Sequence, residues 1–364
     1  MRKPKTLSTA ALGIVALLSV SGCVGSGQAT GQKTSSGSGE TATGTVVVGT
    51  WGGDYSQFQK DSVWPVLAKS DPNVKPVLAI ADSGARDTKL AAEKNGKSSI
   101  DVVMETRTGV QKLIDGGLLM KLDMSKIPNA KNIQTEFKDP YCIPHIVSLA
   151  SIVYNPKYVT APTSYASLWD PKYRGKIGFW WTGENWFPVL FGSAGLKAGG
   201  DPGENLAQGW PGIQSMKSTM DPKSYASNEA LGQALQTGEI WATIAWKARG
   251  VQWNNAGGEQ LKVAIPKETV YPYISCASIA TNAKNPDAAY AYLNALLDPA
   301  PQKYFAEKMG YGPSVTNANL SVELENTIGS SQAVKDGLVS GINYENYAKH
   351  QAEWTTHFDQ IFQK

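Results

Sequence analysis

Thr45-Val46-Val47-Val48-Gly49-Thr50 is a continuous run of β-branched and small residues, and it decides the fold class. A run without polar alternation is typical of a strand in a sheet that is covered on both faces. The run ends in the turn Trp51-Gly52-Gly53-Asp54. After this turn the pattern predicts a helix over residues 55–68, with Asp54 as its cap.

The alternation of strand and helix continues along the chain. Strands are predicted over residues 74–80 and 100–104, and helices over 85–94 and 106–118. Three strand–helix units in about seventy residues indicate a parallel α/β sheet.

The order of elements changes after residue 145. A strand predicted over residues 146–154 has no helix leading into it. Further strands are expected over 177–181, 240–246, 263–266 and 275–280, and further helices over 186–195, 228–237, 286–297 and 301–309. With 364 residues the chain is long enough for two domains.

Composition excludes several classes of protein. The chain is 41% hydrophobic and 18% charged, which excludes disorder throughout, collagen and a coiled coil. The formal net charge is only +3, whereas nucleic-acid binding needs a basic stripe. The 11 Trp and 15 Tyr outnumber the 8 Phe, and such rings are favoured where they meet polar or charged groups.

The first 44 residues are expected to direct export. Basic residues precede an apolar run at residues 12–20, which is shorter than the roughly 20 residues of a membrane span. Val20-Ser21-Gly22-Cys23 resembles the bacterial lipobox, in which the cysteine receives a diacylglycerol. We therefore expect a signal peptide over 1–22, lipidation of Cys23 and a flexible tether over 23–44. The alternative is an ordinary signal peptide whose cleavage site happens to contain a cysteine.

Five segments, in this order, resemble extracellular solute-binding proteins of ABC importers, in the polyamine-binding and ferric-binding branch. They are residues 50–55 (TWGGDY), 99–103 (SIDVV), 169–177 (WDPKYRGKI), 235–240 (LQTGEI) with Trp246, and 280–286 (ATNAKNP). The resemblance implies an α/β protein with the class II periplasmic-binding-protein fold, in which two lobes are joined by two crossover strands. Lobe 1 would comprise 45–147 and 276–318, and lobe 2 would comprise 148–275 and 319–364.

The resemblance also implies a function. The protein would capture a small solute between its lobes and deliver it to the permease subunits of an ABC importer, without catalysis. We expect no cofactor, no metal and no nucleic-acid partner, a monomeric state, and a location in the cell envelope with the lipid anchor on the extracytoplasmic face. A secreted hydrolase is the remaining alternative, although no Gly-x-Ser-x-Gly elbow or phosphate loop is present.

Cys142 and Cys276 would lie close to the two implied crossover strands, near residues 145–149 and 275–278. In an oxidising compartment they are expected to form a disulfide. Two buried free thiols remain the alternative.

In polyamine-binding members, ammonium groups lie against Trp and Tyr faces, and each cation–π contact contributes roughly 0.5–2 kcal/mol. The positions that match this aromatic set are Trp51, Tyr55, Trp181, Trp246, Tyr273 and Tyr311. Four other tryptophans are expected to pack in the core: Trp64, Trp169, Trp210 and Trp241.

The acidic residues that polyamine-binding members use to bind ammonium groups are matched less well in this sequence. Glu184 is the nearest substitute in lobe 2, and Ser275 stands where another acid is expected. In the loop after the third strand, Thr106 fits a ligand-binding hydroxyl, and Glu105 or Glu184 would balance an ammonium. Arg107 is a departure, because a guanidinium repels ammonium and pairs with carboxylate or phosphonate.

The expected ligand is therefore a small cationic or zwitterionic nitrogenous solute. A polyamine, an amino-acid conjugate and an aminophosphonate all stay open. Iron is not expected, because the ferric-binding branch uses adjacent tyrosines and the chain has no Tyr-Tyr pair. His145, His350 and His357 lack the spacing of a zinc site.

Overall fold

The computed structural model describes residues 42–180, 196, 206–258, 260–268, 270–328, 330–339 and 342–362. The expected signal peptide and the lipidation site Cys23 lie outside these residues. Trp181, Glu184 and the helix expected over 186–195 also lie outside them. Within the described part, no helix is both long and apolar enough to cross a membrane.

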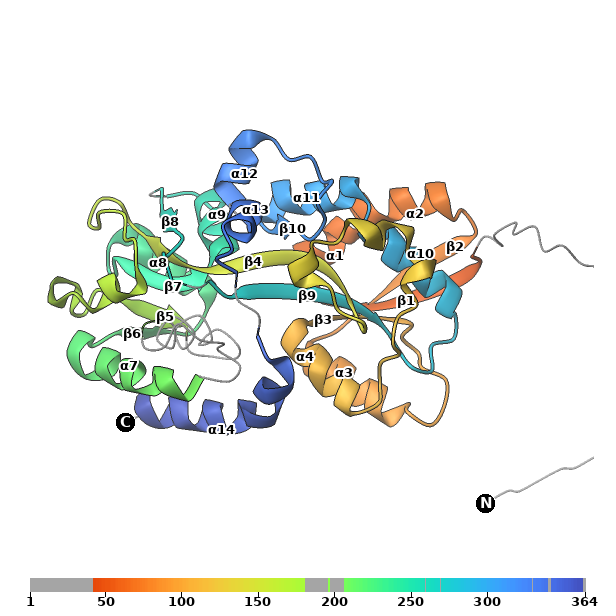
Figure 1. The fold of residues 1–364 in the computed structure, drawn as a ribbon, viewed down its shortest axis with the longest axis horizontal. Coiled ribbons are helices and arrows are strands. Elements are labelled where there is room, and N and C mark those ends of the chain that lie inside the picture. Colours follow the sequence, from red (N-terminus) through yellow and green to blue (C-terminus); the bar gives the residue numbers. More distant parts are fainter. Residues whose placement is uncertain are drawn as a thin grey trace, which may run out of the picture. The chain divides into compact units, whose positions relative to one another are not determined.

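A mixed sheet forms the centre of the described body (Figure 1). Its main path runs β10-β4-β9-β3-β1-β2, and β7 and β8 pair with β4. These strands are β1 (Gly44–Thr50), β2 (Val74–Ile80), β3 (Val102–Thr106), β4 (Ile143–Tyr154), β7 (Ala242–Trp246), β8 (Lys262–Ala264), β9 (Pro272–Ile279) and β10 (Gly312–Pro313). The predicted parallel arrangement is confirmed for β1, which pairs in parallel with both β2 and β3. A separate parallel pair comprises β5 (Gly178–Trp180) and β6 (Lys223–Tyr225).

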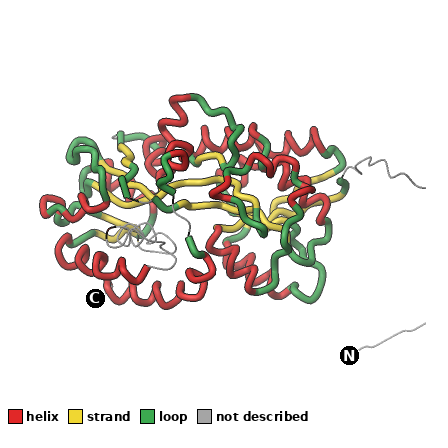
Figure 2. Tube along the Cα trace, viewed as in Figure 1, coloured by secondary structure: helices red, strands yellow, loops and turns green. Residues whose placement is uncertain are grey.

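Helices flank the strands, as Figure 2 shows. Those of the first half are α1 (Asp54–Phe58), α2 (Trp64–Ser70), α3 (Ser83–Ala92) and α4 (Arg107–Asp115). Those of the second half are α7 (Trp210–Ser215), α8 (Asn228–Thr237), α9 (Lys247–Asn255), α10 (Pro286–Leu296), α11 (Pro299–Met309), α12 (Val322–Ile328), α13 (Ser330–Lys335) and α14 (Tyr344–Phe362). Helices α12, α13 and α14 follow the last predicted helix, which ends at residue 309, and were not predicted.

The helix expected over residues 55–68 is present but differs in two ways. A π-helical turn, Gln59–Val63, separates α1 from α2. The expected cap was wrong: the N-cap residue is Gly53, and no side chain caps α1. Gly53 has φ 65°, a left-handed conformation that favours glycine, and this places Asp54 inside the helix as its first residue.

Strands β4 and β9 run side by side through the middle of Figure 1. Residues 143–149 of β4 pair with β9, and residues 150–154 pair with β7 and β8. One hydrophobic core is built almost entirely from residues 46–147 and 274–318. A second core begins at Ala150 and includes Tyr347, Trp354 and Phe358 of α14. Strand β4 therefore passes from one core to the other.

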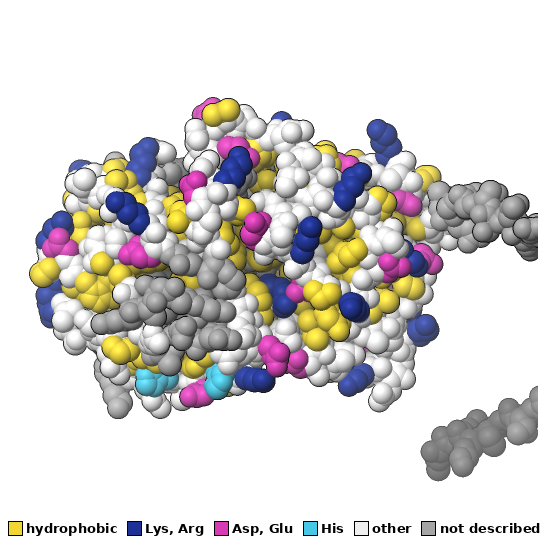
Figure 3. All heavy atoms as spheres, in the orientation of Figure 1, with side chains coloured by type: hydrophobic (Ala, Val, Ile, Leu, Met, Phe, Trp, Pro, Cys, Tyr) yellow, Lys and Arg dark blue, Asp and Glu magenta, His cyan; other side chains and the backbone are white. Residues whose placement is uncertain are grey.

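Charges of both signs are interspersed on the face drawn in Figure 3. This fits the small net charge of +3 and gives no basic stripe among the described residues of that face.

Candidate ligand-binding site

Five of the six predicted aromatic residues lie within the described part of the chain, and their ring contacts form two groups. Trp51 and Tyr55 meet edge to face, with ring centroids 5.3 Å apart. In the second group, the centroid of the Tyr273 ring lies 5.5 Å from that of Trp246 and 5.9 Å from that of Tyr311. We call Trp51, Tyr55, Tyr311, Tyr273 and Trp246 the aromatic line.

Tyr55 and Tyr311 both belong to the first hydrophobic core, and Trp51 and Tyr273 pack against that core. Burial raises the pKa of Tyr55, and the charge interaction with Tyr311 raises it further. Tyr55 and Tyr311 are both buried, whereas Trp51 and Tyr273 are only half-buried. The aromatic line thus joins residues that are more than 190 positions apart in the sequence.

Local structure places Trp51 at the end of β1. The turn through Gly53 directs the chain from β1 into α1, and Trp51 Nε1 donates to Ser83 Oγ at 3.2 Å. The Arg86 guanidinium lies 4.8 Å from the centroid of the Trp51 ring. One cation therefore already contacts this ring.

Glu105 is paired with other residues of the protein. Its carboxylate is 3.2 Å from Arg86 Nη2 and accepts from Ser83 Oγ at 3.0 Å and from the Thr106 backbone N at 2.8 Å. The Glu105 side chain is 3% exposed, and burial raises the pKa of its carboxyl group. Arg86 balances the charge of Glu105 in this structure, and a contact between Glu105 and a ligand stays a prediction.

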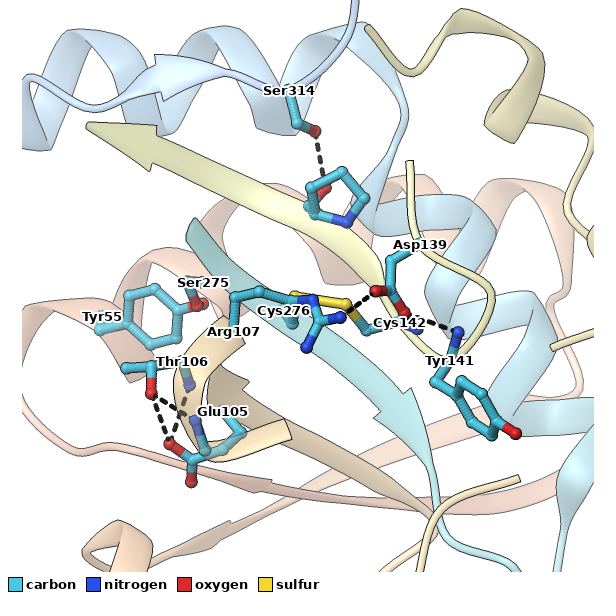
Figure 4. Close-up of a disulfide and its surroundings, with 12 residues drawn as sticks. Tyr55, Glu105, Thr106, Arg107, Asp139, Tyr141, Cys142, Ser275, Cys276 and Ser314 are labelled. Carbon is cyan, nitrogen blue, oxygen red and sulfur yellow. Dashed lines mark hydrogen bonds and ion pairs between the residues drawn. A yellow bond between two sulfur atoms is a disulfide. The ribbon is translucent and has the colours of Figure 1, made fainter. Parts of the chain in front are cut away.

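Arg107 is also engaged within the protein. It forms an ion pair with Asp139, and its guanidinium lies 4.5 Å from the centroid of the Tyr344 ring in α14. Figure 4 shows Arg107 pointing toward Asp139. Asp139 also accepts from the backbone N of Tyr141 at 2.8 Å. Asp139 balances the charge of Arg107 in this structure, and a contact between Arg107 and the acidic end of a ligand stays a prediction.

Thr106 has a structural task at the end of β3. It is the N-cap of α4, and its Oγ1 accepts from the Gly109 backbone N at 3.2 Å and hydrogen-bonds to Thr108 Oγ1 at 2.9 Å. A side-chain oxygen at this position satisfies a backbone N–H that the helix leaves free. Ligand contact by Thr106 stays a prediction.

Ser275 lies at one end of a short hydrogen-bond chain, with the Tyr55 hydroxyl at its centre. The Tyr55 hydroxyl is 3.1 Å from Ser275 Oγ and 2.8 Å from His145 Nδ1. Ser275 belongs to β9 and His145 to β4, so Tyr55 is tied to both long strands. Nothing in the sequence around His145 indicates this contact, because Tyr55 lies 90 positions away in the chain.

Cys142 and Cys276 form a disulfide, with Cα atoms 5.6 Å apart (Figure 4). Cys276 pairs in register with Pro144, two residues after Cys142. The bond therefore joins β9 to the start of β4.

The other four tryptophans pack as expected. Each is partly buried and lies against a hydrophobic core: Trp64, Trp169, Trp210 and Trp241. Among the described residues, no group of three or more His, Cys, Asp or Glu side chains is arranged to hold a metal.

Burial of His145 predicts a loss of stability in acid. Desolvation lowers the pKa of His145 from 6.5 to about 3, so the unfolded chain gains a proton below about pH 6.5 that the folded protein rejects. The free energy of unfolding is therefore unaffected by His145 above about pH 7.5. It falls by about 2–3 kcal/mol between about pH 7.5 and pH 4.5. Urea denaturation at both pH values measures this loss.

The matched control is His145→Asn, which removes the titrating group. The difference between wild type and this variant cancels the contributions of other groups, including the raised pKa of Glu105. Equal losses in the two proteins would refute the assignment of the acid sensitivity to His145.

Curated polyamine-binding proteins are similar to this chain in sequence. The spermidine/putrescine-binding periplasmic protein of Escherichia coli (strain K12) is 28% identical over 295 residues, which cover 72% of this chain and 80% of that protein. The putrescine/cadaverine-binding protein of Pseudomonas aeruginosa is 27% identical over 241 residues, which cover 62% of this chain and 67% of that protein.

Solved structures share the fold. The crystal structure of an ABC transporter from Clostridium perfringens ATCC 13124 superposes with a TM-score of 0.75 at 25% identity, covering 87% of this chain and 99% of that chain. The predicted periplasmic-binding fold is confirmed. Residues 57–329 match the family of bacterial extracellular solute-binding proteins, and the chain belongs to this family.

Proposed function

We propose that this protein is the substrate-binding receptor of an ABC importer and that it captures a small polyamine-like cation against the aromatic line. Family membership and the two polyamine-binding relatives support the receptor function. The aromatic line is the observation that carries the ligand class, because the faces of Trp and Tyr rings attract an ammonium group, and more strongly as water is excluded.

The body would work as two lobes with the boundaries given by the sequence, 45–147 with 276–318 and 148–275 with 319–364. The aromatic line has members from both, since Trp51 and Tyr55 belong to the first range and Trp246 to the second. A ligand that contacts both groups would favour the state in which they approach each other. Lipidation at Cys23 would hold the receptor on the extracytoplasmic face of the membrane, close to the permease subunits.

A plain cation fits the described residues better than a zwitterion. Arg107 was the residue that favoured an amino-acid conjugate or an aminophosphonate, and its guanidinium pairs with Asp139. Glu105 likewise forms an ion pair with Arg86. Of the two acids predicted to balance an ammonium group, Glu184 is therefore the one that we favour. A hydrolase finds no support in the relatives, which are named as binding proteins.

Putrescine and spermidine should bind, and Trp246→Ala should weaken binding by about thirtyfold. Loss of a desolvated cation–π contact removes about 2 kcal/mol, which corresponds to this factor. Calorimetric titration measures the affinity. In a thermal-shift assay, ligand at about 100 times its Kd should stabilise the wild type by about 2.7 kcal/mol.

Trp241→Ala is the matched control, because Trp241 lies just before the start of β7 and Trp246 lies at the end of that strand. The Trp241 ring stacks on the Tyr158 ring, with centroids 5.3 Å apart. This variant should lower stability and leave the affinity unchanged. The proposal fails if 4-aminobutyrate or 2-aminoethylphosphonate binds more tightly than putrescine, or if neither diamine nor spermidine binds.

A further inference from the structure

His145 lies outside the aromatic line but contacts one of its members. The residue sits at an irregularity of β4, where Pro144 pairs with Cys276 and Ile146 pairs with Ser275. One extra residue on β4 therefore stands opposite two consecutive residues of β9, which is the pattern of a β-bulge. Pro144 has no N–H to donate to the ladder, and this is a physical reason for the interruption at this point.

The bulge is held from several sides. Gln302 Nε2 donates to the His145 carbonyl at 2.8 Å, and Ser314 Oγ donates to the Pro144 carbonyl at 2.6 Å. The Phe305 ring lies 4.5 Å from the imidazole and 5.4 Å from the Tyr55 ring. His145 is completely buried, so its side chain has a fixed place and a fixed partner.

That partner is the Tyr55 hydroxyl, which is 2.8 Å from Nδ1. Ser275 Oγ is the second partner of the same hydroxyl, at 3.1 Å. With these two contacts, one from β4 and one from β9, the Tyr55 ring is held between Trp51 at 5.3 Å and Phe305. A hydroxyl at the buried end of this ring needs partners, and without them the ring would shift to find others.

We propose that His145 is a positioning residue for ligand recognition, which holds the Tyr55 ring in the aromatic line through the hydrogen bond between Nδ1 and the Tyr55 hydroxyl. The inference rests on the proposed function, because it takes Tyr55 as a residue that contacts the ligand. His145 itself touches no ligand in this arrangement. Its neutral form is the one present at physiological pH, since burial lowers the pKa of His145.

The test compares two replacements of similar size. His145→Asn keeps a polar group near the position of Nδ1, and its amide can either accept from or donate to the Tyr55 hydroxyl. His145→Leu fills the space beside Phe305 and can do neither. Putrescine affinity, measured by calorimetric titration, should fall about five- to tenfold in His145→Leu, as expected for one lost hydrogen bond, and should stay within about threefold of wild type in His145→Asn.

A second arm removes the hydroxyl instead of its partner. Tyr55→Phe should weaken putrescine binding to a similar degree as His145→Leu, and the double variant Tyr55→Phe/His145→Leu should be no weaker than Tyr55→Phe alone. Such non-additivity is the signature of one shared interaction, whereas a general packing role of His145 gives additive losses. Urea denaturation of each variant confirms that it is folded under the titration conditions.

The outcomes separate the two proposals. Equal affinities of His145→Leu and His145→Asn, or additive losses in the double variant, overturn the positioning role while the wild-type titration still supports a polyamine receptor. If His145→Leu does not fold, His145→Asn decides, and a loss of tenfold or more in that variant overturns the inference. Absence of putrescine and spermidine binding to the wild type refutes the proposed function and the positioning role with it.

Discussion

Replacing Cys142 and Cys276 together with alanine should lower the free energy of unfolding by about 4–5 kcal/mol. The two cysteines are 134 residues apart, and a cross-link that closes so long a loop removes much of the conformational entropy of the unfolded chain. The disulfide also joins β9 to the start of β4, the strand that passes between the two cores. Urea denaturation of the oxidised wild type and of the double variant gives the difference.

Wild-type protein treated with reductant is the control for this experiment. It should unfold at nearly the same urea concentration as the double variant, since both lack the bond. A thiol titration of denatured, unreduced protein tests the bond itself. Two reactive thiols in that titration would show that Cys142 and Cys276 are not paired.

Arg86→Met should destabilise the protein by about 3–5 kcal/mol, because it leaves a buried carboxylate without its partner. The Arg86 side chain is 1% exposed and that of Glu105 is 3% exposed. Arg86 also donates to the Met104 carbonyl at 2.6 Å and to Ser83 Oγ at 3.1 Å. Urea denaturation followed by Trp fluorescence measures the loss.

Two further variants make the result specific. Arg86→Met/Glu105→Gln removes both charges, so it should recover part of the lost stability. Lys112→Met breaks an exposed ion pair with Asp87, in which the Lys112 side chain is 69% exposed, and it should cost less than about 1 kcal/mol. If Arg86→Met is as mild as Lys112→Met, the Arg86–Glu105 pair does not stabilise the protein.

Secondary structure followed closely from the sequence where the signals are local. The expected strand over residues 74–80 and the expected helix over 228–237 coincide with β2 and α8. In α8, Ser227 caps the start and Gly238 adopts a left-handed conformation at the end, two signals that can be seen in the sequence itself. The wrong assignment of Asp54 as the cap shows the limit of such signals. The left-handed backbone of Gly53 begins α1 one residue earlier than the side-chain signal of Asp54 predicts.

The sequence by itself determined the α/β class, the parallel start of the sheet and the family. These follow from hydrophobic patterns, turn residues and short segments, all of which are properties of neighbouring positions. Only the tertiary structure decided which charges are free. Glu105 and Arg107 look like ligand-binding groups in the sequence, but Arg86 and Asp139, 19 and 32 positions away, neutralise them. The physical reason is that the energy of a charge or a hydroxyl depends on the partner that the fold brings within about 3 Å, and no local pattern contains that partner.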